Sequence, residues 1–152
     1  MTITRATVDD VDTITAQRRA MFFDMGHRDE ALLDGMCTAF RPWLRPRIAT
    51  GEYLGWFVLG GDGTHASGVG LWLMDWLPHV IGPGSARGNI VNVYTHPDSR
   101  RRGMARALMA IALDWCRENH IACVILHASP EGKRLYESMG FRPTNEMRLL
   151  LS

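Results

Sequence analysis

Three consecutive arginines followed by a glycine, Arg100, Arg101, Arg102 and Gly103, form the run most suited to chemistry in this sequence. They lie between a β-prone segment and a helix-forming one, so backbone N–H groups at the helix start lack intrahelical partners and can converge on an anion. The helix dipole adds about half a positive charge at that end. The run therefore predicts a diphosphate site. Neither GxxxxGK[ST] nor GxGxxG is present, which excludes a P-loop and a dinucleotide fingerprint.

The elements that must position this run form a strand–loop–helix–strand unit. IVNVYTH, residues 90–96, indicates a buried strand that ends at Pro97. Residues 104–119 are helix formers with one apolar face, and residues 123–126 indicate a second buried strand. A further helix is expected to start at Ser129-Pro130-Glu131 and to stop at Gly140.

The first half of the chain predicts helices and a hairpin. A short strand at residues 3–6 precedes a helical segment that places Val8, Val11, Ile14 and Arg18 at helical spacing. Asp29 can cap a second helix, in which prolines at positions 42 and 46 predict a stop or a kink.

Two apolar segments between residues 52 and 76 flank a Gly-Gly-Asp-Gly turn and predict a hairpin. Residues 77–88 should be an irregular connection, and residues 147–151 should form a last strand.

Length and composition favour one domain over residues 1–152. Seventeen Lys and Arg against sixteen Asp and Glu give no basic footprint for nucleic acid. Three cysteines without ligand spacing predict neither a disulfide framework nor a metal site. No apolar run approaches the ~18 residues of a membrane span, so we expect no membrane association and a cytoplasmic protein.

Two motifs carry a resemblance to a known family. VNVYTHPDSRRRGMARALM resembles the signature of GNAT acetyltransferases, whose Q/R-x-x-G-x-G/A pattern is matched by Arg100, Gly103 and Ala105. LYESMGF, about thirty residues downstream, is similar to the family's LYxxxGF segment. The resemblance covers residues 89–142 and implies an α/β fold, with a mostly antiparallel mixed sheet flanked by helices and a βαβ unit that binds coenzyme A.

The resemblance also implies how the donor, acetyl-CoA, would be held. Val93, Tyr94 and Thr95 occupy the strand positions that pair with the pantetheine arm, and a backbone N–H there would stabilise the oxyanion. The diphosphate would be held by backbone N–H groups of the loop, which comprises Arg101, Arg102, Gly103, Met104, Ala105 and Arg106.

Tyr136 matches the family's tyrosine that protonates the departing thiolate, and a phenol with a pKa near 10 is protonated at neutral pH. The same residue could instead be an ordinary aromatic of the core. Ser129 stands where the family often has an asparagine that contacts pantetheine, and it could be a pantetheine contact or only a helix cap.

The residue that accepts the proton of the amine is not identified by any motif. Many relatives have a glutamate on the strand before the loop, whereas this strand has only Asn89 and Asn92. Asp75, at a predicted strand end, is the preferred candidate base, and His79, His96 and His127 are the alternatives.

The function implied is N-acetylation of an amine, on a small molecule or a peptide, by direct attack in a ternary complex. The alternative is a non-catalytic module that binds or senses acyl-CoA, which the missing strand carboxylate favours. A homodimer through the C-terminal strands is also implied by the resemblance.

Overall fold

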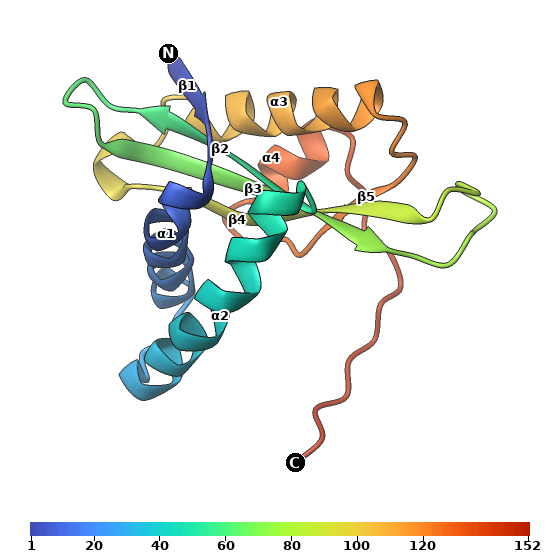
Figure 1. The fold of residues 1–152 in the computed structure, drawn as a ribbon, viewed down its shortest axis with the longest axis horizontal. Coiled ribbons are helices and arrows are strands. Elements are labelled where there is room, and N and C mark those ends of the chain that lie inside the picture. Colours follow the sequence, from blue (N-terminus) through green and yellow to red (C-terminus); the bar gives the residue numbers. More distant parts are fainter.

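The computed structural model describes residues 1–152 and contains a five-stranded sheet with helices on both faces (Figure 1). The strands lie side by side in chain order, antiparallel except for the parallel pair β4–β5. This mixed sheet confirms the predicted fold class. The strands are β1 (Thr2–Arg5), β2 (Tyr53–Leu59), β3 (His65–Asp75), β4 (Ala86–Thr95) and β5 (Val124–Leu126).

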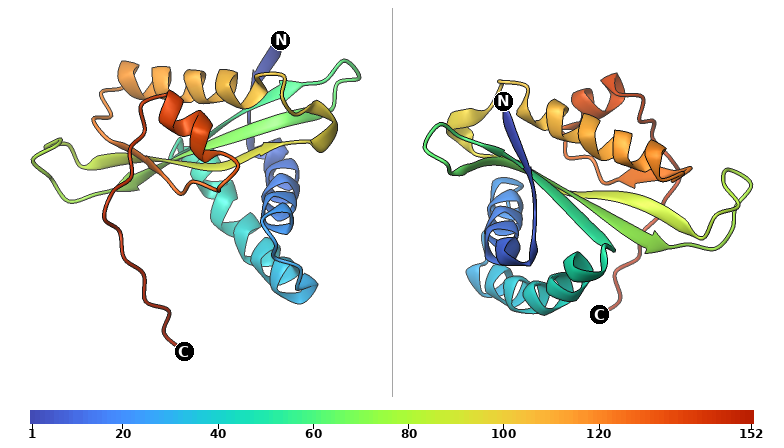
Figure 2. Two further views of the ribbon diagram at one scale, coloured as in Figure 1. Left: turned by 180° about the vertical axis from the view of Figure 1, so that it is seen from behind. Right: turned by 45° about the horizontal axis from the view of Figure 1, so that its top comes forward.

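The helices form two layers. Helices α1 and α2 cover one face of the sheet, and α3 and α4 cover the other (Figures 1 and 2). Their bounds are α1 (Val11–Asp24), α2 (Glu30–Thr50), α3 (Met104–Glu118) and α4 (Lys133–Ser138), with short 3₁₀ turns η1 (Val8–Asp10) and η2 (Pro97–Ser99). None of the helices is long and apolar enough to cross a membrane.

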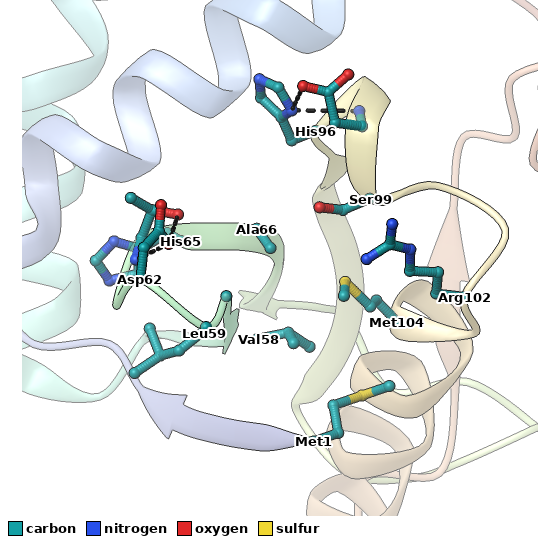
Figure 3. Close-up of a pocket in the computed structure, with 14 residues that line it drawn as sticks. Met1, Val58, Leu59, Asp62, His65, Ala66, His96, Ser99, Arg102 and Met104 are labelled. Carbon is teal, nitrogen blue, oxygen red and sulfur yellow. Dashed lines mark hydrogen bonds and ion pairs between the residues drawn. The ribbon is translucent and has the colours of Figure 1, made fainter.

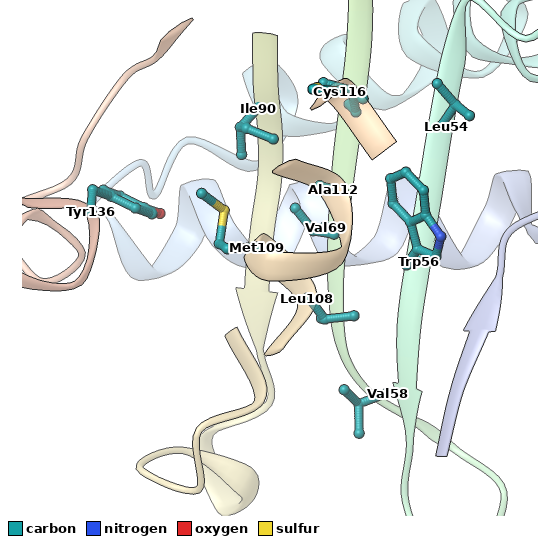
Figure 4. Close-up of a cluster of buried hydrophobic side chains, with 11 residues drawn as sticks. Leu54, Trp56, Val58, Val69, Ile90, Leu108, Met109, Ala112, Cys116 and Tyr136 are labelled. Carbon is teal, nitrogen blue, oxygen red and sulfur yellow. The ribbon is translucent and has the colours of Figure 1, made fainter. Parts of the chain in front are cut away.

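Each helical layer packs on its own buried cluster. The cluster beneath α3 contains Leu71, Leu108 and Met109, all with no exposed surface, and Figure 4 shows Tyr136 at its edge with the ring pointing toward Met109. Burying each such side chain contributes about 1.5–3 kcal/mol. The cluster beneath α1 and α2 includes Leu44 and Tyr53. The sheet between them is therefore held rigidly from both sides.

The position of the Tyr53 side chain explains why residue 70 of β3 is a glycine. The phenol of Tyr53 lies over Gly70, and a Cβ at position 70 would overlap the hydroxyl oxygen. That hydroxyl accepts a hydrogen bond from Asn92 Nδ2 at 2.9 Å. Burial raises the pKa of Tyr53 to about 12, so the group is a neutral structural anchor between β2 and β4.

Several sequence predictions are confirmed. The hairpin is β2–β3, the helix after the arginines is α3, and Asp29 Oδ1 accepts from the N–H groups of Ala31 at 3.0 Å and Leu32 at 3.3 Å as the cap of α2. Strand β4 begins earlier than expected, at Ala86, because its first residues pair with the end of β3. Helix α4 begins later, at Lys133, after a turn in which the Ser129 carbonyl accepts from Gly132 and Lys133.

Two predictions are wrong. Helix α2 does not stop at Pro42 or Pro46 but runs through both to Thr50, because its second half buries Leu44 against the sheet and this packing outweighs the lost backbone bonds. Residues 147–151 form no strand, because no other strand lies beside them. The chain after α4 leaves the body on the side of α1 and α2 and runs on alone (Figures 1 and 2).

Candidate functional site

Strands β4 and β5 separate halfway along β4. Their pairing covers only Gly88, Asn89 and Ile90, the last opposite Leu126. From residue 91 to residue 95, β4 has a neighbouring strand only in β3. The predicted pantetheine residues Val93, Tyr94 and Thr95 lie on this open edge. An extended ligand that carries amides can add to such an edge as a strand.

A β-bulge lies at the start of the open edge. Gly68 pairs with Tyr94 and Gly70 with Val91, so Val69 alone faces Asn92 and Val93. Asn92 adopts a left-handed φ of 55°. Its side chain bonds Tyr53 beneath α2, whereas Val93 packs against the α3 cluster. Val91 also packs in the cluster beneath α1 and α2, so the bulge places two successive side chains, those of Val91 and Asn92, on the same face of the sheet.

The start of α3 presents free backbone donors. Arg101 and Gly103 have left-handed φ values of 63° and 75°, which turn successive N–H groups toward one side. The first helical bond runs from Ala107 N to Gly103 O at 3.0 Å. No backbone partner is found for the N–H groups of Arg101, Arg102, Gly103, Met104, Ala105 and Arg106. This arrangement suits an anion.

The arginine side chains differ in what they bind. Arg100 donates to the carbonyl of Thr95 at 2.9 Å and to Asp24 at 2.7 Å, so it braces the loop against the end of α1. Arg106 donates to Ser138 Oγ at 2.7 Å and joins α3 to α4. Arg101 and Arg102 are exposed and make no ion pair. The side chains of Arg100 and Arg106 are thus engaged within the chain, whereas those of Arg101 and Arg102 are not.

Tyr136 projects from α4 into the cluster beneath α3. Its side chain is buried, and its hydroxyl makes no hydrogen bond within the chain. Burial raises the pKa of Tyr136, which keeps the phenol protonated. Ser129 Oγ accepts from the Gly132 N–H at 3.2 Å within the turn before α4; the N-cap of that helix is Gly132, so Ser129 is not the predicted helix cap.

Asp75 is not part of this site. Asp75 pairs with Ala86 at the start of β4. Because Ala86 precedes Val93 by seven residues, Asp75 lies about 20 Å from Val93 at the usual rise per residue. The geometry contradicts its assignment as the base. His79 belongs to the same distant hairpin, where it pairs with Gly82.

His127 directly follows the last residue of β5 that pairs with β4, at the point where the two strands separate. Its Nε2 lies 3.2 Å from Glu146 Oε2. A histidine oriented by a carboxylate is a common arrangement for general bases. Two candidate bases flank the open edge: His127, where β4 and β5 separate, and His96, directly after Thr95.

The other face of the open edge carries a residue that the sequence analysis did not assign to the site. Arg18 Nη1 donates to Asn92 Oδ1 at 2.8 Å. A signal was present in the sequence, since Arg18 occupies the apolar helical spacing of Val11 and Ile14. A charged residue on a buried stripe needs a partner or a function.

A cavity of about 890 Å³ lies next to the arginine loop, and Ser99, Arg102 and Met104 are among the residues that line it. Figure 3 shows it between the β2–β3 turn and η2, with Asp62 and His65 on one side and His96 and Arg102 on the other. It takes nothing from β5 or α4. His96 lines it and lies 3.7 Å from Asp98. No cluster of His, Cys, Asp or Glu that could hold a metal is found.

Residues 65–149 match the family model described as an acetyltransferase (GNAT) domain. The fold is similar to that of a GCN5-related N-acetyltransferase from Ralstonia eutropha, with 38% sequence identity and a TM-score of 0.92. The match covers 99% of this chain and 97% of the Ralstonia chain.

Two more distant structures share the fold. One is a predicted acetyltransferase with acetyl-CoA from Clostridium acetobutylicum, at 21% identity and a TM-score of 0.87 over 99% of this chain and 95% of that one. The other is a ribosomal-protein-alanine N-acetyltransferase from Brucella melitensis, at 17% identity and a TM-score of 0.68 over the full length of both chains. No curated protein sequence matches the chain.

Proposed function

Since the chain belongs to the GNAT acetyltransferase family, we propose that it transfers the acetyl group of acetyl-CoA directly to an amine. One observation carries the proposal: the open edge of β4 leads into a helix start whose backbone donors are free, so one ligand can pair with the edge and place its diphosphate at the helix. Coenzyme A has these two parts in this order.

The reaction proceeds at the end of the open edge. The amine nitrogen attacks the thioester carbonyl carbon, and a backbone N–H of Val93 or Tyr94 stabilises the oxyanion. The C–N bond forms, the C–S bond breaks, and the thiolate takes the proton of the Tyr136 hydroxyl. The products are an amide and free coenzyme A.

His127 accepts the proton that the amine must lose, directly or through water. Its place where β4 and β5 separate, and its contact with Glu146, support this role. A histidine that has taken the amine proton can return one to Tyr136 through solvent, which restores the starting state.

The test is an acetylation assay in which thiol release from acetyl-CoA is followed against a panel of amines, with an amine-free reaction as control. Release that depends on an amine and saturates with both substrates is expected. Saturable acetyl-CoA binding without release for any primary amine, amino acid or lysine peptide would instead establish a non-catalytic acyl-CoA-binding module.

We also propose a homodimer in which the tail of each copy adds to the free outer edge of β5 in the other. Residues Met147, Leu149, Leu150 and Leu151 are 80–96% exposed, which is unfavourable for a single copy in water. Strand β5 is the last strand of the sheet, so its outer backbone groups have no strand partner. The tail and the edge complement each other.

A Leu150→Glu variant is expected to shift the protein from dimer to monomer in sedimentation velocity, because the new carboxylate would be buried in the exchanged strand. Val80→Glu, at a side chain 97% exposed in the β3–β4 connection, is the matched control and should stay dimeric. A wild-type protein that sediments as a monomer at all concentrations would rule the exchange out.

A further inference from the structure

Arg18 on α1 is a half-buried cation without an acidic partner. Every ion pair of the chain involves other residues; Arg19, for example, lies 3.0 Å from Asp34. Arg18 Nε is buried and has no hydrogen-bond partner. Burial lowers the pKa of Arg18, because removal from water disfavours the charged form.

The groups around Arg18 are aromatic or neutral. Its guanidinium lies 4.8 Å from the ring centre of Phe22 and 5.0 Å from that of Phe40. Asn92 accepts from Nη1, and the protonated phenol of Tyr53 lies beyond it. Cation–π contacts and one amide compensate part of the desolvation, but no negative charge is present.

This cation lies on the α1 and α2 face of the open edge. Because the donor would lie along that edge, an acceptor bound on this face would meet the thioester next to Asn92, whose side chain lies on the same face. Asn92, the hydrogen-bond partner of Arg18, directly precedes Val93 at the proposed oxyanion position.

A second unpartnered group lies on the same strand and the same face. Asn89 is 7% exposed, its Oδ1 has no hydrogen-bond partner, and its cross-strand neighbour Trp72 packs on the α2 side. A buried acceptor atom without a donor costs about 1–3 kcal/mol. The donor Arg18 Nε and the acceptor Asn89 Oδ1 therefore both lack a hydrogen-bond partner on this face of the sheet.

We propose that the acceptor is an amine that also carries a carboxylate, and that Arg18 binds this carboxylate. This rests on the proposed acetyl transfer. The Arg18 guanidinium is hydrogen-bonded to the side chain of Asn92, the residue before Val93. The amine and the carboxylate of the acceptor should therefore be separated by few bonds, as in a free amino acid. The rings of Phe22 and Phe40 favour an apolar or aromatic body on that amino acid.

The test compares three acceptors that share the same aromatic amine skeleton and differ at the carboxyl group: phenylalanine, phenylalaninamide and phenethylamine. In the wild type the acid is expected to have the lowest KM. Arg18→Gln should raise the KM of phenylalanine about 10- to 100-fold, the usual effect of losing a charged hydrogen bond, and change the other two less than about threefold. The KM of acetyl-CoA should stay unchanged. Taurine and an aminophosphonate distinguish a carboxylate site from a general anion site.

Two further variants guard against a change in folding. Arg18→Lys keeps the charge and loses the planar fork, so it should recover part of the selectivity. Arg41→Gln, which removes a surface pair with Asp12 at 3.1 Å, is the matched control and should behave as the wild type. An equal rise of KM for all three acceptors in Arg18→Gln, or no preference for the acid in the wild type, would overturn the proposal.

Calorimetric titration of the CoA-bound protein with the same three compounds provides a readout without turnover. Carboxylate-dependent binding that Arg18→Gln abolishes supports the acceptor site even if no amine is acetylated. Acetylation of amines that does not depend on a carboxylate or on Arg18 would support the acetyl transfer and reject the proposed carboxylate site. The two proposals can therefore fail separately.

Discussion

Replacement of Tyr136 by phenylalanine is expected to lower kcat by about 100- to 1,000-fold, the usual effect of losing a positioned general acid. The substitution removes only the hydroxyl, which bonds nothing in the chain, and leaves the ring in the α3 cluster. Acetyl-CoA should therefore bind with the wild-type Kd, and Tm should change little. Thiol-release kinetics and calorimetry measure the two quantities.

The pH dependence of kcat gives a second readout for Tyr136. A general acid works while it is protonated, and burial raises the pKa of this phenol above 10.0. On the alkaline side, the wild type should lose activity only beyond the ordinary pKa of a tyrosine, and the phenylalanine variant should lack this alkaline decline. If kcat is the same in both proteins, Tyr136 does not protonate the thiolate.

Replacement of His127 by glutamine is expected to lower kcat at neutral pH by about 100-fold, because the amine then has only water to accept its proton. Glu146→Gln keeps the histidine but weakens its orientation, so a loss of several-fold is expected. The Kd of acetyl-CoA should be unchanged in both variants.

His79→Gln is the matched control for His127. His79 is also a histidine near a strand end, but it lies in the β3–β4 connection at the far end of β4. We expect it to have wild-type kinetics. A His127→Gln variant as active as the control across the pH range would show that another group or bulk solvent takes the proton.

The free backbone donors before α3 and the open edge of β4 are the structural features that the sequence predicts best. The free N–H groups at Gly103 and the open edge at Val93 follow from a local order of strand, loop and helix, which short motifs encode. The placement of Asp75 could also have been deduced, since the end of one hairpin strand pairs with the start of the next and the site lies at the other end of β4.

Other features depend on tertiary contacts that no local pattern reveals. Pro42 and Pro46 are poor helix residues, yet the packing of Leu44 carries α2 past them. The tail at residues 147–151 has the composition of a strand, but a strand needs a partner, and its own sheet ends at β5. Arg18 meets Asn92 only because a bulge turns that side chain toward α1.

The exposed tail also determines where this protein can be altered without harm. An affinity tag or a fluorescent protein fused after Ser152 would begin directly beside Leu151, within the segment that we expect to join two copies. The other end is not free either, since Met1 lines the large cavity. The tip of the β3–β4 connection, where Val80 is 97% exposed, is the better place for a label or an immobilisation site.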